Sequence, residues 1–318
     1  MMMKRWQLLV VIINYKTPDL VCDALASLEG EVNTETEHVV VVDNNSQDGS
    51  LAVINEYIVG RGYGGWVSIV AAEFNGGFSY GNNIGIKFAK ADYYLLLNSD
   101  AYVHPQAIPI LLDKMKEDER LGIAGPRLEW PDGSQQVSCF RNLTPLNSFL
   151  NAVKIGFITR FLGRFNVQEV AVPLDQHGAI QPEWLSFACV MLRGSMVRDI
   201  GLMDEAYFMY REDNDYCRRA IQAGWGLMFE PKSRVVHLNK GDSNQTALKR
   251  LPNYYFESRS RYFSKYYGKW GLLAANILWS MGRCISLFRE FVQRRPKAFH
   301  STMLSDIWIG FSSQVRKK

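Results

Sequence analysis

The first part of the chain alternates between short apolar runs and segments that begin with helix-start signals. Residues 8–14 form a continuous apolar run, which is typical of a strand buried on both faces of a sheet. Pro18 opens a helical segment that reaches about Leu28, and Pro105 stands where its missing N–H suits a helix start. The same alternation predicts strands at 38–43, 66–72 and 93–97, with helices beginning at Asp48 or Ser50 and at Ser79.

This order of elements predicts an α/β fold with a mostly parallel central sheet and helices on both faces. Ligands of such sheets bind at the carboxyl ends of the strands. The pattern changes after residue 120, and residues 142–182 predict only a loop or short helices. The expected later elements are a hairpin turn at 131–134, a strand at 183–192, a short helix from Ser195, a helix at 211–223, short strands at 227–230 and 234–237, and helices from Pro252 onward.

Composition indicates a folded protein with a sizeable core. The 318 residues are 47% apolar and 13% aromatic, which argues against disorder and suits one large domain or a domain with an appendage. We expect one large domain at 1–244, in two parts at about 1–120 and 121–244. A basic, aromatic-rich helical region is expected at 245–318.

The five cysteines stand singly in apolar contexts, which predicts reduced, buried thiols in a cytoplasmic protein. The N-terminal apolar run ends at Asn14 and no small-residue cleavage site follows, so it is interpreted as a first strand rather than a signal peptide. No stretch reaches the roughly 18 apolar residues of a membrane span.

Charge is distributed unevenly along the chain. The net charge is +4, but residues 245–318 hold 14 Lys and Arg against three acidic residues, a balance of +11 that leaves −7 for the remainder. Such asymmetry predicts that the C-terminal region meets something anionic, for example a membrane surface. The alternative is a helical pair that packs on the catalytic domain or on a partner subunit, including a homodimer. No nucleic-acid-binding module accompanies the charge, so nucleic acid is not an expected partner.

Four chemically active side chains stand at strand ends or at a helix start. Asp43 ends one predicted strand, Asp100 follows another by two residues, His237 ends a third, and Asp213 lies in the acidic start of a helix. A sheet that gathers its strand ends on one edge brings such residues into one cleft. Carboxylates with an imidazole there are what a divalent cation, a nucleoside diphosphate and a general base require.

Each candidate also has a purely structural explanation. Asp43 could cap the next helix, the Gly- and Asn-rich stretch 74–85 could be a tight turn rather than a phosphate loop, and Asp100 could be a solvated turn residue. The acids at 212–215 are favoured by the helix dipole, and a lone strand-end histidine is often structural. Asp213 and Asp215 cannot share a helix face, so we expect one to face the cleft and the other to pair with an arginine.

Taken in order, the motifs resemble a known family. Over about residues 7–240 the chain closely resembles family 2 glycosyltransferases, and looks most like their rhamnosyltransferase branch. The motifs that carry this resemblance are Val-Val-Asp-Asn-Asn-Ser-x-Asp-Gly-Ser, Asn-Gly-Gly-Phe with Gly-Asn-Asn-x-Gly, Leu-Leu-Leu-Asn-x-Asp, Glu-Asp-x-Asp-x-x-x-Arg and Val-x-His.

The resemblance implies a GT-A fold, a divalent cation (Mg²⁺ or Mn²⁺) and inversion at the anomeric carbon. By position, Asp43 would contact the base, Asp100 the metal, and His237 the metal or the diphosphate, while Asp213 would be the general base. The residues expected to bind the nucleotide are Asn14, Asp43, Asn75, Gly76, Asn83 and Asn98.

The implied activity is transfer of rhamnose or another hexose in cell-surface polysaccharide synthesis. The donor would be dTDP- or UDP-linked, and the acceptor a glycan or a polyprenyl-linked glycan. The expected location is the cytoplasm, or peripherally the inner face of the membrane. A sugar-1-phosphate nucleotidyltransferase is an alternative, but it would need a Gly-rich basic segment where this chain has residues 14–17. A non-catalytic sugar-nucleotide-binding module would be expected to lack Asp100, Asp213 or His237, and all three are present.

Three departures from the family pattern matter for specificity. Ser99 replaces the proline of a common Asn-Pro-Asp, which is a mild change. Phe187 replaces the glycine of a common Ser-Gly-Ala near the donor sugar or acceptor, which leaves the identity of the sugar open. The Gln-x-x-Arg-Trp motif of processive synthases is absent, which favours a single transfer per encounter.

Overall fold

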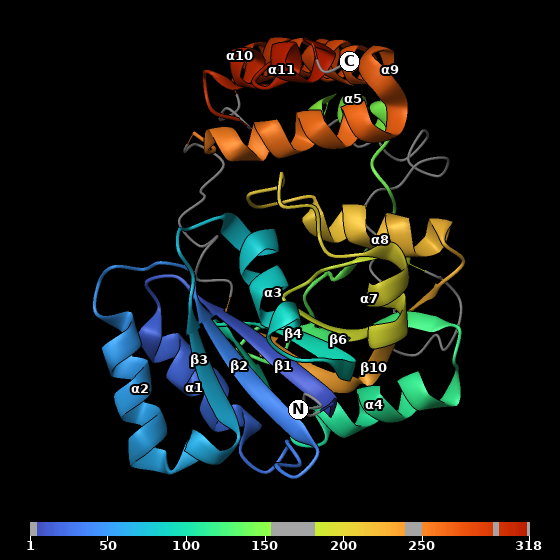
Figure 1. The fold of residues 1–318 in the computed structure, drawn as a ribbon. Coiled ribbons are helices and arrows are strands. Elements are labelled where there is room, and N and C mark those ends of the chain that lie inside the picture. Colours follow the sequence, from blue (N-terminus) through green and yellow to red (C-terminus); the bar gives the residue numbers. More distant parts are fainter. Residues whose placement is uncertain (1–4, 154–181, 239–249, 295–298, 317–318) are drawn as a thin grey trace. The chain divides into compact units, whose positions relative to one another are not determined.

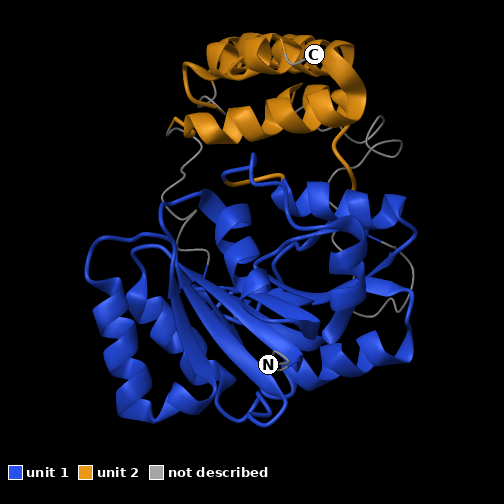
Figure 2. Ribbon diagram, viewed as in Figure 1, with its two compact units in different colours: residues 1–140, 171–208, 212–239 blue, residues 141–170, 209–211, 240–318 orange. Residues whose placement is uncertain are grey.

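The computed structural model describes residues 5–153, 182–238, 250–294 and 299–316, and the chain forms two compact units (Figure 2). Unit 1 comprises residues 1–140, 171–208 and 212–239, and unit 2 comprises residues 141–170, 209–211 and 240–318. The predicted domain boundary at 244 lies outside the described residues. A segment from the middle of the chain, α5 (Pro145–Val153), packs on the C-terminal helix of unit 2 although it precedes that boundary.

Unit 1 is built on an eight-stranded sheet with the order β3-β2-β1-β4-β9-β6-β10-β5, and β7 and β8 form a separate pair. The strands are β1 (Trp6–Asn14), β2 (Glu37–Asp43), β3 (Val67–Ala71), β4 (Ala91–Asn98), β5 (Ala101–Val103), β6 (Leu121–Glu129), β7 (Cys139–Phe140), β8 (Trp184–Leu185), β9 (Cys189–Arg193) and β10 (Gly226–His237).

Six of the eight strands run in one direction. β1 to β4 pair in parallel, and β6 and β10 also pair in parallel. β9 is antiparallel to both β4 and β6, so these two strands share a direction, while β5 is antiparallel to β10. The structure therefore confirms the mostly parallel α/β sheet, and it places the carboxyl ends of β1, β2, β4 and β10 on one edge.

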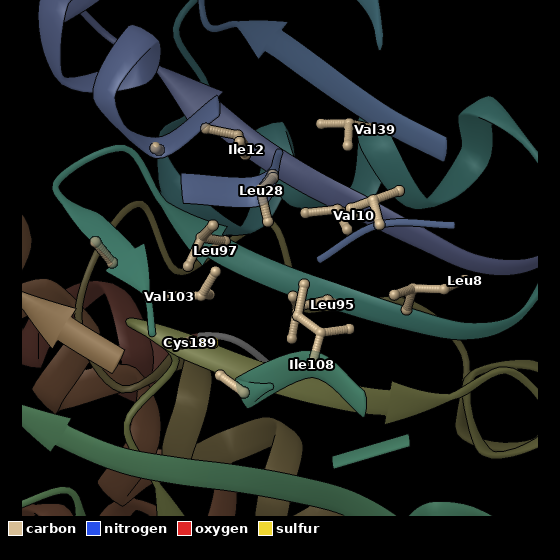
Figure 3. Close-up of a cluster of buried hydrophobic side chains, with 14 of the residues drawn as sticks. Leu8, Val10, Ile12, Leu28, Val39, Leu95, Leu97, Val103, Ile108 and Cys189 are labelled. Carbon is tan, nitrogen blue, oxygen red and sulfur yellow. The ribbon is translucent and has the colours of Figure 1, made fainter. Parts of the chain in front are cut away.

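Helices cover both faces of this sheet (Figure 1). Leu8, Val10 and Ile12 of β1 are fully buried in one cluster with side chains of α1, α2 and α4 (Figure 3). On the opposite face α3 packs so closely that a Cβ on Gly85 would meet Val11 at 2.2 Å. The helices of unit 1 are α1 (Pro18–Leu28), α2 (Ser50–Arg61), α3 (Gly77–Phe88), α4 (Ala107–Glu117), α7 (Gly194–Ile200) and α8 (Glu212–Gln222), with a 3-10 turn η1 (Tyr63–Gly65).

Several later elements differ from the sequence prediction. The strand expected at 183–192 is two strands, because β8 pairs with β7 and β9 pairs with β4. The two strands expected at 227–237 are one strand, β10, whose register shifts beside Pro231, a residue without an N–H for the ladder. β5 and β6 were not predicted, since neither stands out by alternation, whereas the 131–134 turn is present with Gly133 N–H donating to the carbonyl of Trp130.

Unit 2 is helical within its described residues. Its helices are α5, α9 (Asn253–Val292), α10 (Met303–Asp306) and α11 (Phe311–Arg316). Gly268 interrupts α9 with φ +66° and ψ −178°. Glycine adopts such a positive φ readily because it has no Cβ. Phe256, Trp279 and Ile307 contribute to its small core.

Two expectations about this region need correction. The expectation that no stretch is long enough to span a membrane does not hold for α9, which runs through residues 253–292. A window of this helix reaches a mean hydropathy of 1.3, which makes it long and apolar enough to cross a membrane by length and composition alone. The cysteines are not all buried either: all five are free thiols, and Cys284 on α9 is exposed.

Candidate active site

The ends of β1 and β2 form a buried polar cluster. Asn14 and Asp43 are paired in the sheet register, and Asn14 Nδ2 donates to Asp43 Oδ1 at 2.6 Å. Ser46 completes the cluster, since its hydroxyl donates to the same oxygen at 2.5 Å and its backbone N–H donates to Asp43 Oδ2 at 3.1 Å. Asn14 Oδ1 in turn accepts the backbone N–H of Thr17. These contacts hold the Asp43 carboxylate in one orientation at the strand tip.

Asp43 does not cap the next helix. α2 begins at Ser50, and Gly49 precedes it without a side-chain cap. An ionised carboxylate offers about four lone-pair positions, and the three hydrogen bonds from Asn14 and Ser46 leave it acceptor capacity. Asp43 therefore keeps one acceptor position beyond its contacts with Asn14 and Ser46.

The Gly- and Asn-rich stretch wraps the start of α3. Asn44, which follows β2, donates to Asn75 Oδ1 and to the carbonyl of Gly77, both at 3.0 Å. Gly77 has φ +83°, and a Cβ there would lie 1.9 Å from the carbonyl oxygen of Phe208. Phe78 N–H donates to that same oxygen at 2.7 Å. Gly77 thus allows the segment before α8 to lie directly against the start of α3, and Asn75 and Gly76 are half-buried at this junction.

Asn83 lies apart from the residues grouped with it in the sequence. Its amide donates to the carbonyl of Met203 and to Glu205, and its Oδ1 accepts the N–H of Met203. The side chain is 1% exposed, and these three hydrogen bonds attach α3 to the loop that follows α7. We therefore place Asn83 among the structural residues rather than in the nucleotide site.

Asp100 and His237 lie next to each other on the same edge of the sheet, where β10 pairs with β5. His237 Nε2 lies 3.4 Å from Asp100 Oδ1. Their strands pair so that His237 is opposite Ala101, and Leu238 N–H donates to the Asp100 carbonyl at 2.9 Å. Asn98, at the end of β4, donates its N–H to the carbonyl of Ala188, and its side chain is half-buried.

Gln136 determines which nitrogen of His237 carries the proton. Gln136 Nε2 faces the carbonyl oxygens of His237 at 2.6 Å and Glu129 at 3.3 Å, and carbonyls only accept. Its Oε1 is therefore the atom 3.1 Å from His237 Nδ1, and it accepts the Nδ1–H. In the neutral ring Nε2 is then unprotonated and faces Asp100. The Asp100 carboxylate oxygen and this Nε2 are thus two electron-pair donors of the kinds that metal ions bind in proteins.

The acidic start of α8 separates into two roles. Asp215 is buried, accepts from the Tyr207 hydroxyl at 3.3 Å and pairs with Arg219 at 3.1 Å. Arg219 also donates to two backbone carbonyls, so this pair is structural. Asp213 is half-buried and accepts the N–H of Asn214 at 2.7 Å. The expectation that one of these acids pairs with an arginine is confirmed for Asp215.

Helix α8 is linked to the end of β4 by a short series of contacts. Tyr216, one turn along the same face of α8, contacts the ring of Phe187 edge-on at 6.1 Å. Ala188, the next residue, accepts the N–H of Asn98. Next to Asp213, the amide of Asn214 is fully buried with no hydrogen-bond partner among the described residues, so both its atoms remain for water or a ligand.

The structure thus gathers most of the predicted residues along one edge of unit 1. Asn14 and Asp43 form one cluster and Asp100 and His237 a second, while Asp213 stands in the first turn of α8. Sequence reasoning missed Gln136, whose role depends on a fold contact across 101 positions. Within the described residues no group of three or more His, Cys, Asp or Glu could hold a metal alone, so a cation at the Asp100–His237 pair would need further oxygens from phosphate or water.

Comparison with known sequences points to one enzyme family. The family model described as "Glycosyl transferase family 2" matches residues 9–166. The chain is 29% identical over 213 residues to an N-acetylglucosaminyl-diphospho-decaprenol L-rhamnosyltransferase of Mycobacterium tuberculosis, covering 63% of this chain and 66% of the relative. It is 23% identical to the rhamnosyltransferase WbbL of Escherichia coli K12, covering 80% and 92%. The match thus spans about two thirds of the length of the Mycobacterium tuberculosis relative.

Solved structures show the same fold. The mannosyltransferase PcManGT of Pyrobaculum calidifontis, in complex with GDP-Man and Mn²⁺, superposes with a TM-score of 0.55 at 12% identity and covers 99% of this chain and 88% of that one. GalNAc-T7 with UDP, GalNAc and Mn²⁺ gives 0.61 at 16% identity over 90% of this chain and 56% of that one. These likenesses confirm the predicted GT-A class of fold.

Proposed function

Because the chain belongs to glycosyl transferase family 2, we propose that it moves a hexose, with rhamnose as the first candidate, from a nucleoside diphosphate to a glycan or polyprenyl-linked acceptor. The observation that supports this proposal is the shared strand edge, where Asn14 holds the Asp43 carboxylate and His237 lies 3.4 Å from Asp100. The two rhamnosyltransferase relatives favour rhamnose among the hexoses.

Asp213 acts as the general base in this proposal. Its carboxylate accepts the proton of an acceptor hydroxyl while the hydroxyl oxygen forms a bond to the anomeric carbon. The bond from that carbon to the diphosphate oxygen breaks on the opposite face, so the configuration inverts. Asp213 is assigned this role because it is half-buried in the first turn of α8, whereas Asp215 is buried and bound to Arg219.

Asp43, Asp100 and His237 bind the donor. Asp43 accepts the N3–H of a uracil or thymine ring, which favours UDP- or dTDP-linked donors. Asp100 and His237 would hold Mg²⁺ or Mn²⁺, since a carboxylate oxygen and the Nε2 lone pair lie 3.4 Å apart. When bound, the cation neutralises charge that develops on the leaving diphosphate.

A donor screen tests the proposal. The purified chain is incubated with dTDP-rhamnose, UDP-GlcNAc, UDP-glucose or GDP-mannose, a polyprenyl-diphosphate-linked sugar acceptor and Mn²⁺, and release of the nucleoside diphosphate is measured. We expect release with dTDP-rhamnose that depends on the acceptor. Turnover restricted to another sugar would exclude rhamnose, and formation of a nucleotide sugar from a sugar phosphate would favour the nucleotidyltransferase alternative.

Gln136→Leu is expected to weaken Mn²⁺ binding in the presence of UDP by about 10- to 100-fold, because loss of an outer-shell partner frees the imidazole tautomer and ring orientation. Isothermal titration of Mn²⁺ into protein and UDP measures this directly. Gln222→Leu, on the exposed end of α8, is the control and should bind as the parent does. Equal Mn²⁺ affinity in both variants would remove Gln136 from the account of the site.

A further inference from the structure

An unbroken apolar stripe runs along the second half of α9. It is defined here by its exposed members, Trp270, Ile277, Met281, Ile285, Phe288, Phe291 and Val292. From Trp270 to Phe291 the successive members are three, four or seven residues apart, and Val292 follows Phe288 by four. These spacings place all of them on one helix face over about six turns. Phe288 is 71% exposed and Phe291 83% exposed, although large aromatic side chains are normally covered. An apolar face of this length marks a contact surface.

The opposite face of the same helix is polar and covered. Arg283 Nη1 donates to Glu290 Oε1 at 2.7 Å and to Ser286 Oγ at 3.1 Å, and all three side chains are buried. Asn276 accepts from the buried Arg259 at 2.5 Å. A Cβ on Gly282 would lie 2.7 Å from a carbonyl of α5, which shows how closely that helix packs here. A helix with a buried ion pair on one side is suited to lie along an apolar phase, not to cross it alone.

Charge at the ends of the stripe indicates what covers it. Lys265 and Lys269 are exposed before it, and Arg294 is exposed after it. Between Ser258 and Arg294, all of which the structure describes, the acidic residue Glu290 is buried against Arg283. The exposed charges of this segment are therefore positive, and they flank the stripe without interrupting it. Two copies meeting through this face would bring like charges together, whereas an anionic lipid surface complements them.

We propose that the stripe is a membrane-docking surface that lies in the headgroup region of an anionic bilayer, with its lysines and arginine among the phosphates. This inference goes beyond the proposed function and does not depend on it. It would hold unit 2 at a membrane surface, the compartment boundary at which a polyprenyl-linked acceptor is found.

Sedimentation with vesicles tests the docking surface. The full chain is mixed with vesicles of phosphatidylcholine alone or of phosphatidylcholine with phosphatidylglycerol, at low and high salt. We expect binding to the anionic vesicles that weakens as salt screens the charges. The double variant I277S/F288S should lower the partition coefficient at least about tenfold, because less apolar surface enters the lipid. Val59→Ser, on α2 of unit 1 with the same 71% exposure as Phe288, is the matched control.

Three results would overturn the proposal. The first is that I277S/F288S and the parent chain bind the anionic vesicles equally. The second is that the parent chain binds neither kind of vesicle, while light scattering shows that it is a dimer and that the double variant is a monomer. In the second case another copy of the chain covers the stripe. The third is retention of the chain in cell membranes after alkaline carbonate extraction, since a docked helix is released and a spanning helix is not. Circular dichroism of the double variant confirms that it is folded.

Discussion

Asp213→Asn is expected to lower turnover by at least about 10²-fold while donor binding stays nearly unchanged, since the amide keeps the size of the side chain and removes its basicity. The carboxylate sits in the first turn of α8, separate from the Asp215–Arg219 pair that holds the helix in place. Steady-state kinetics with the donor identified by the screen measure turnover, and titration calorimetry measures donor binding.

Asp19→Asn is the matched control for this change. Asp19 occupies the second position of α1, as Asp213 does in α8, so both variants lose the same favourable interaction with a helix dipole, about 0.3–1 kcal/mol. Only the Asp213 variant should lose turnover. Near-normal turnover of Asp213→Asn would transfer the role of base to Glu212 or Asp215, the other acids of that turn.

Removal of the divalent cation is expected to abolish transfer, and Asp100→Ala to weaken Mn²⁺-dependent UDP binding at least about 10²-fold. The loss should exceed the 10- to 100-fold typical of an outer-shell change, because Asp100 is itself a proposed ligand. Activity with and without EDTA measures the first effect, and titration of UDP with and without Mn²⁺ measures the second. His237→Ala should change binding in the same direction.

Asp132→Ala serves as the control, since Asp132 is an exposed carboxylate in a turn of the same unit. UDP binding without metal should be the same in all these variants. Full activity in EDTA, or UDP binding by Asp100→Ala that still increases with Mn²⁺ as in the parent, would mean that transfer does not use the cation site described above.

The first half of unit 1 was predictable because its strands are buried on both faces. Continuous apolar runs therefore mark β1, β2 and β4, and the polar residues that end them, Asn14, Asp43 and Asn98, fall on one edge by topology alone. The pairing of one acid of α8 with an arginine was also predicted, although helix geometry could not determine that this acid is Asp215.

The remaining features depend on contacts between distant segments. β9 is antiparallel because Leu97 pairs with Cys189, and no local pattern encodes that pairing. Asn83 belongs to a Gly-Asn-Asn sequence that resembles a ligand loop, but its partners lie 120 and 122 positions away in the loop after α7. Gln136 is recognisable only when the carbonyls of Glu129 and His237 are both in place.

The position of β10 has a consequence for the order in which the site assembles during synthesis. β5 is the edge strand of the sheet and pairs with β10, which ends at His237. A ribosome-bound chain that has emerged only to α8 already holds the paired ends of β1 and β2, yet the partner strand that positions Asp100 has not been made. Contacts of such long sequence separation form late. A nascent chain would therefore form the Asn14–Asp43 contact before the contact between Asp100 and His237.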